Sequence, residues 1–165
     1  NANPPQARLG AIHWGLTQAD RKHTGIKQCR HPPESQYRSA YPAKIDMART
    51  TGFAAEHQAV KYLKQHGLSL ICSNYSCKMG EIDAIMQDDK TLVFVEVKAR
   101  SSEQHGHPAE YVTTAKQRKI IKTAQHFLMT QPQYQHFACR FDVVCIQLNT
   151  ENAALWIEDA FQVNH

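Results

Sequence analysis

The chain has 165 residues and a formal net charge of +4, which suits one domain of ordinary size with an additional segment. This mild basic excess is compatible with a polyanionic partner but does not by itself indicate one. The five cysteines are odd in number and form no Cys-x-x-Cys pair. They argue against a disulfide scaffold or a zinc site and favour a reducing compartment, the cytoplasm. No apolar run is long enough to cross a bilayer, so we expect no membrane partner.

Residues 1–47 are predicted to form a disordered or loosely ordered basic N-terminal arm. They hold seven Lys/Arg and three Asp/Glu, and therefore carry the whole excess charge, together with five of the seven prolines. They lack sustained hydrophobic periodicity, which is typical of segments that do not build a core. A basic arm that contacts nucleic acid is the functional alternative, but the density of positive charge is too low to favour it. Residues 48–165 are expected to form the folded domain.

The domain is predicted to open with a helix between residues 50 and 67. Apolar residues and one acid follow helical spacing: Phe53, Glu56, Val60 and Leu63. A carboxylate on the core-facing stripe of a helix needs a partner, because burial of an unpaired charge is costly. Glu56 is therefore either a candidate site residue or a residue at the edge of the stripe.

Three strands are predicted next, over residues 68–75, 80–87 and 92–98. Their short connections, with a polar turn at residues 88–90, favour an antiparallel meander. A second helix is expected from about Thr114 to Met129, with Thr114 and Gln117 as a capping box. A strand over residues 137–148 follows this crossover and would run parallel to a neighbour, and residues 155–157 would add an edge strand. The expected fold is α/β, in the order α-β-β-β-α-β.

The strand at residues 92–98 places an acid and an amine in an apolar sequence. Side chains alternate along a strand, so Glu96 and Lys98 share one face and the valines share the other. The apolar residues at nearly every position indicate that both faces of this strand are buried. Such charges are costly in an interior unless they are paired, metal-bound or hydrated. A buried structural ion pair and a functional site are both consistent with this pattern.

The turn at residues 88–90 predicts which charges meet. A turn centred between Asp89 and Lys90 opposes residues whose numbers sum to 179, so Asp83 would face Glu96 and Glu81 would face Lys98. Opposed carboxylates repel unless a cation lies between them, and Mg²⁺ or Mn²⁺ prefers such oxygen ligands. The metal would activate a water for phosphodiester hydrolysis, and Lys98 would orient that water or neutralise developing charge.

These residues carry a family resemblance. Gly80-Glu81-Ile82-Asp83 followed by Val95-Glu96-Val97-Lys98 resembles the motif of the PD-(D/E)XK nuclease superfamily. More closely, the chain resembles the YraN family, also called UPF0102. The matching runs span about residues 50–147, and beyond the two motifs they are Gly52–Glu56, Asn74-Tyr75, Ala99-Arg100, Gly106-His107-Pro108, Lys116 and Arg140–Val144. The resemblance implies a restriction-endonuclease-like αβββαβ core, with a mixed central sheet flanked by helices, similar to archaeal Holliday-junction resolvases.

The resemblance also implies roles for individual residues. Asp83 and Glu96 would be metal ligands and Lys98 the catalytic lysine, while Glu56 matches the acid on the first helix that assists metal or water binding. Lys116 matches a position where superfamily members often place an added polar residue of the site.

The sequence leaves the roles of several further residues open. Lys116 is equally well interpreted as a solvated lysine at a helix start, and Arg100 follows the motif strand and would hold a phosphate. Asp142 is interpreted first as a structural acid, and His105 and His107 as solvated loop residues.

The first functional hypothesis is a Mg²⁺- or Mn²⁺-dependent endonuclease that acts on DNA, including branched or structured DNA. The alternatives are a nucleic-acid-binding module with little cleavage, and an interaction protein whose acidic cluster only holds the core. A symmetric homodimer would suit a cut in both strands.

Overall fold

A computed structural model describes residues 47–100, 112–147 and 154–163, apart from the side chains of residues 47–50. Within these ranges the elements are α1 (Met47–Gln65), β1 (Ser69–Cys77), β2 (Gly80–Asp88), β3 (Thr91–Arg100), α2 (Thr114–Thr130), the 3-10 turn η4 (Pro132–Tyr134), β4 (Ala138–Gln147) and β5 (Ala154–Ile157). The predicted α/β order, including the short final strand, is confirmed. The predicted arm lies outside the described residues except for Met47, which opens α1.

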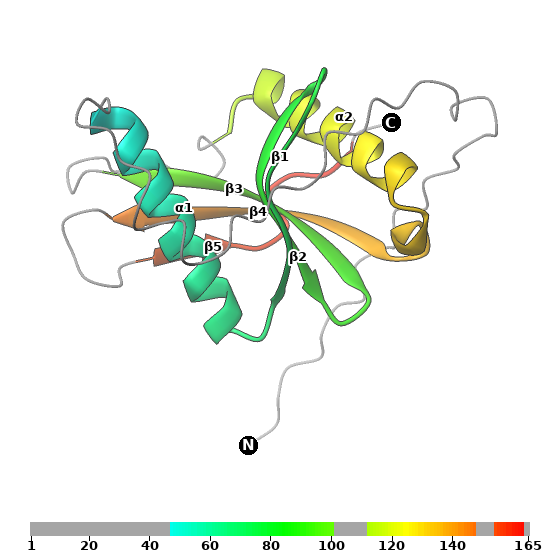
Figure 1. Cartoon of the computed structure of the whole chain (residues 1–165), viewed down its shortest axis with the longest axis horizontal. Helices are drawn as coiled ribbons and strands as arrows, with labels where there is room; N and C mark the ends of the chain where they lie inside the picture. Colours follow the sequence, from blue (N-terminus) through cyan, green and yellow to red (C-terminus); the bar gives the residue numbers. More distant parts are fainter. Residues whose placement is uncertain (1–46, 101–111, 148–153, 164–165) are drawn as a thin grey trace, which may run out of the picture.

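The strands form one mixed sheet in the order β1-β2-β3-β4-β5. Neighbours run antiparallel except β3 and β4, which are parallel because α2 crosses over between them. A two-residue turn joins β2 to β3, with Asp88 paired to Thr91 and Asp89 at a φ of 50°. The predicted register is confirmed over the five pairs from there to Ala84 and Val95. Figure 1 shows α1 and α2 on either side of the strands.

The central strand β3 is buried on both faces. Leu92 and Phe94 pack on the α2 side, where the Phe94 ring lies 5.5 Å from Phe141 and 6.2 Å from Phe127. Val93 and Val95 pack on the α1 side. The sheet therefore holds two apolar layers, and any charge on β3 enters one of them.

The buried stripe of α1 differs from the predicted one. Ala55, Ala59 and Leu63 are fully buried, four residues apart, whereas Phe53 is 54 % exposed. Small alanines let the helix lie close to the branched side chains of β3, and this leaves no room for an aromatic ring at the start of the stripe. The prediction that Phe53 faces the core was wrong. Glu56, next to Ala55, lies at the margin of the buried stripe and is half-buried.

The α2 helix begins one residue earlier than the predicted cap implies. Thr113 is the N-cap, and its Oγ1 accepts a hydrogen bond from the Lys116 amide at 3.3 Å. Gln117 instead donates through Nε2 to the Val112 carbonyl at 2.9 Å. The predicted capping box of Thr114 and Gln117 was therefore out of register by one residue. No helix in the described ranges combines the length and apolarity that a membrane crossing needs.

The side-chain alternation of β2 reverses at one point. Tyr75 and Ile82 pack on the α2 side, but Ala84 packs on the α1 side, and the break falls at Asp83 opposite Asn74. Asn74 has a φ of 52°, a left-handed conformation that Asn tolerates better than most residues.

The β2–β3 ladder ends beside this reversal. Its last pair is Ala84 with Val95, so Asp83–Glu96 and Glu81–Lys98, expected as opposed pairs, are not part of it. Asp83 instead accepts a hydrogen bond from the Val97 amide through Oδ2 at 2.7 Å. The expectation of direct pairing failed because β2 parts from β3 one residue too early. Where β2 leaves β3, side chains from the two faces of the sheet come close to one another.

Candidate active site

Three carboxylates from three elements interact where β2 parts from β3. Glu56 comes from α1, Asp83 from β2 and Glu96 from β3. Glu96 is only 3 % exposed, and its charge raises the pKa of both other carboxyls. The structure therefore brings the three predicted acids together, although α1 and Glu96 lie on opposite faces of the sheet.

Asp83 is the most perturbed of these acids. Burial, followed by the charge of Glu96, raises its pKa to about 7, with a smaller contribution from Glu56. The hydrogen bond from the Val97 amide and the charge of Lys116 oppose this rise. Asp83 thus exchanges a proton near neutral pH, as groups in functional sites often do.

Glu56 approaches the cluster from α1 with one oxygen unsatisfied. Burial, together with the charges of Glu81 and Glu96, raises the pKa of Glu56, while a hydrogen bond from the Asn74 side chain opposes the rise. Its Oε2 is buried and has no hydrogen-bond partner. A buried oxygen of this kind is costly unless a cation or water approaches it.

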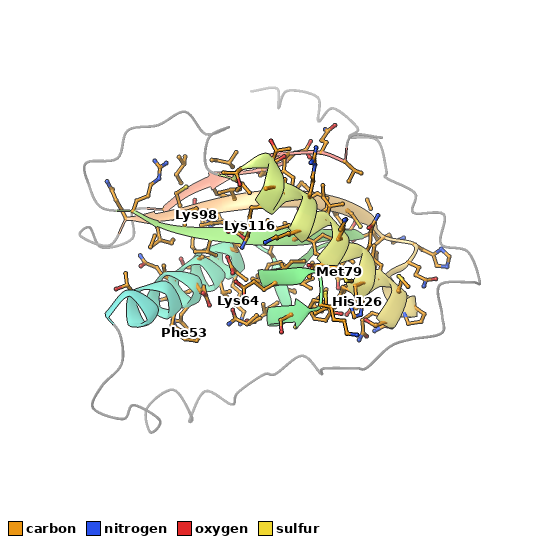
Figure 2. The ribbon with its side chains drawn as sticks, turned by 90° about the horizontal axis from the view of Figure 1, so that it is seen from above. Phe53, Lys64, Met79, Lys98, Lys116 and His126 are labelled. Carbon is orange, nitrogen blue, oxygen red and sulfur yellow. The ribbon has the colours of Figure 1, made fainter. Side chains whose placement is uncertain are left out.

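Two lysines hold the two oxygens of Glu96. Lys98 Nζ donates to Oε1 at 2.8 Å, and Lys116 Nζ forms an ion pair with Oε2 at 3.2 Å that is not an aligned hydrogen bond. Their side chains are 37 % and 31 % exposed, so both lysines are partly open to solvent. Lys116 is therefore part of the cluster rather than a purely solvated residue. Figure 2 labels both lysines, one on β3 and one on α2.

The charge of Lys116 is secured by this contact. Burial alone would lower its pKa, but the charge of Glu96 and the smaller effects of Asp83 and Glu81 outweigh burial and raise it. Lys116 consequently stays protonated over the whole physiological range.

The acidic side chains of the cluster offer only oxygen atoms to a metal ion. Within the described ranges, no three His, Cys, Asp or Glu side chains form a preformed cage. Glu56 Oε2 is nevertheless a buried oxygen without a hydrogen-bond partner, Glu96 Oε2 meets only the Lys116 ion pair, and Asp83 adds a third carboxylate. Mg²⁺ is commonly held by one or two carboxylates plus water and substrate phosphate, without a full protein cage. The oxygen-only donors fit such an open site for Mg²⁺ or Mn²⁺.

Two groups of candidates remain: Arg100 at the end of β3, and two loop histidines. Arg100 ends β3 opposite Gln147, and its charge, with that of Lys98, opposes the burial that raises the pKa of the Cys145 thiol. The loop residues His105 and His107 fall outside the described residues.

Asp142 is a structural acid, as expected. It is fully buried and accepts hydrogen bonds from Arg140 Nε at 3.0 Å, Trp156 Nε1 at 2.9 Å and the Asp159 amide at 3.0 Å. Its oxygens are satisfied by these donors, so they are not available to a ligand.

Asn74 is the site residue that sequence reasoning missed. It lies opposite the point where the side-chain alternation of β2 reverses, and it hydrogen-bonds Glu56. The available signal was an Asn within an otherwise regular strand pattern, since Asn is depleted in strands and tolerates a positive φ.

Comparison with known proteins identifies the family of this chain. The model of the family described as "Uncharacterised protein family UPF0102" matches residues 55–146. A UPF0102 protein of Psychromonas ingrahamii is 45 % identical over 121 residues, which cover 73 % of this chain and 97 % of the relative. UPF0102 protein NE0719 of Nitrosomonas europaea is 46 % identical over 117 residues, which cover 71 % of this chain and 98 % of the relative. A UPF0102 protein of Saccharophagus degradans is 48 % identical over 114 residues, which cover 69 % of this chain and 94 % of the relative. The chain therefore belongs to the UPF0102 family.

Proposed function

We propose that this protein is a divalent-metal-dependent endonuclease that hydrolyses phosphodiester bonds of DNA, including branched or structured DNA. The observation that carries the proposal is the meeting of Glu56, Asp83 and Glu96 with two lysines where β2 leaves β3. The likeness of residues 80–83 and 95–98 to the PD-(D/E)XK motif supports the same reaction class.

Asp83, Glu96 and Glu56 would hold Mg²⁺ or Mn²⁺, and the bound ion would polarise a phosphoryl oxygen and lower the pKa of a water. The remaining work belongs to the side chains. Lys98 is anchored on Glu96 Oε1 and its side chain is 37 % exposed, so a phosphate bound beside Glu96 would meet its positive charge. Arg100, two residues further along β3, is proposed to hold a neighbouring phosphate.

A nucleic-acid-binding module with little cleavage is the second candidate, and one observation favours it. Both oxygens of Glu96 already face a lysine, and the described residues contain no three-ligand cage. An acid neutralised in this way would leave a basic, phosphate-binding surface without a strongly held metal. The two candidates differ in turnover and share DNA binding.

The test uses linear duplex, single-stranded, flapped and four-way DNA with Mg²⁺, Mn²⁺ or EDTA. Asp83→Asn, Glu96→Gln and Lys98→Ala are compared with two matched controls. Asp89→Asn changes an exposed acid in the β2–β3 turn, where Asn tolerates the positive φ, and Lys64→Ala removes an exposed lysine of α1.

The proposal predicts cleavage that requires the divalent ion and falls at least about 100-fold in the three site variants, since loss of such charge stabilisation costs this much or more. Both controls should keep wild-type rates. Metal-independent cleavage, or full activity of the site variants, would contradict the mechanism. DNA binding that survives the site substitutions, with no turnover on any substrate, would identify the binding module.

A further inference from the structure

The α2 helix carries a row of positive charge without acidic neighbours. Its sequence, residues 114–130, holds four Lys/Arg and no Asp or Glu, and all four lie between Lys116 and Lys122. Arg118, Lys119 and Lys122 are exposed. None of these three forms an ion pair with another described residue. Their charge is therefore projected into solvent.

This arrangement works against the helix itself. Arg118 and Lys122 are four residues apart, and Lys119 is three residues from both Lys116 and Lys122. Like charges at these spacings repel across the helix surface, and cations in the first turns also oppose the helix dipole. An ordinary solvated helix would mix acids into this face, so helix stability does not account for the row.

The row starts at the candidate site and is extended by the β1–β2 turn. Lys116, its first member, contacts Glu96. A Cβ placed on Gly80 would lie 3.4 Å from the Lys119 Cβ, so this turn packs directly on α2. The turn carries the exposed Lys78, and Figure 2 shows its neighbour Met79 beside the helix. We name Lys78, Arg118, Lys119 and Lys122 the basic ridge.

We propose that the basic ridge binds the phosphate backbone of duplex DNA that flanks the bond at the site, an inference that rests on the proposed function. The segment from Lys116 to Lys122 rises about 9 Å, over which one DNA strand advances by about two to three nucleotides. Exposed lysine and arginine side chains suit contacts to phosphate, which position a duplex without reading its sequence. The ridge thus sets where the duplex lies relative to Glu96.

The test measures binding without chemistry, by fluorescence anisotropy of a labelled 30-base-pair duplex in EDTA at several salt concentrations. The ridge variant combines Arg118→Gln, Lys119→Gln and Lys122→Gln. The matched control combines Lys61→Gln, Lys64→Gln and Lys90→Gln, which removes equal charge from exposed residues of α1 and of the β2–β3 turn. Lys116 stays in place because it contacts Glu96.

We expect the slope of log affinity against log salt to become shallower by about 2 to 3 in the ridge variant, close to 0.9 per lost phosphate contact. The control should change it by less than about 1. The ridge variant should melt at the wild-type temperature or above, since repulsion is removed. Equal slopes for the two triple variants would overturn the inference.

The binding and cleavage experiments together distinguish failure of this inference from failure of the proposed function. Metal-dependent cleavage with unchanged slopes would reject the ridge and leave the nuclease standing. A shallower slope in the ridge variant without cleavage would support the ridge and reject the nuclease. Absence of duplex binding by the wild type would overturn the ridge, whatever the cleavage result on other substrates.

Discussion

The unusual acid Asp83 makes the stability of this protein depend on pH in a defined direction. Its pKa is about 7 in the folded protein against an ordinary 3.8, so the folded state prefers the protonated carboxyl. The stabilisation from the neutral acid is complete below about pH 4 and is lost as the pH rises through about 7. Asp83→Asn keeps a neutral acceptor for the Val97 amide at every pH and removes this dependence.

The expected size follows from the two pKa values. Each pKa difference of one is worth about 1.4 kcal/mol, and integration between pH 5 and pH 8 gives about 2 to 3 kcal/mol for Asp83. As the pH rises from 5 to 8, the free energy of unfolding of Asp83→Asn should therefore increase by about 2 to 3 kcal/mol relative to that of wild type.

Urea unfolding of wild type and Asp83→Asn at pH 5, 6, 7 and 8, in EDTA with a thiol reductant, measures this difference. Asp89→Asn, at the exposed turn, is the control and should track wild type throughout. A stability difference between Asp83→Asn and wild type that stays constant from pH 5 to pH 8 would refute the argument that burial and Glu96 keep this acid protonated.

Three further results are expected. Mg²⁺ should raise the melting temperature of wild type at pH 8 and much less at pH 5.5, where Asp83 holds its proton; equal shifts would contradict the site. Lys116→Met should destabilise by about 1 to 3 kcal/mol in urea, because Glu96 loses a partner, and adding Glu96→Gln should recover part of the loss; strict additivity would argue against the ion pair. Phe53→Ala should change stability by less than about 0.5 kcal/mol, whereas Phe127→Ala should cost about 3 to 5; similar losses would show that Phe53 is buried.

Local chemistry made the order of elements and the hairpin register predictable. Asp89 and Lys90 mark a tight turn between two apolar runs, and a two-residue turn fixes the register of the pairs that form, here as far as Ala84 and Val95. The same reasoning identified Asp83, Glu96 and Lys98, since charges in an apolar strand pattern stand out.

The rest depended on tertiary contacts that spacing does not encode. Phe53 fits the helical period as well as Ala55 does, and only the closeness of α1 to β3 selects the alanine. The reversal at Asn74 depends on a single backbone angle, and it decides that Asp83 bonds the Val97 amide rather than facing Glu96. Lys116 meets Glu96 only because α2 crosses back over the sheet.

The parallel pairing of β3 with β4 has a consequence for how the site assembles during folding. Val95 and Asp142 are partners although 47 positions separate them, whereas β1, β2 and β3 join through short turns. Closing the longer loop costs more chain entropy and is intrinsically slower. Asp83 and Glu96 lie on the two strands of the β2–β3 hairpin, only 13 positions apart, and Lys98 is on β3 itself. We therefore expect these three charges to meet when the hairpin forms, and the second lysine, Lys116, to reach Glu96 only when α2 docks on the sheet.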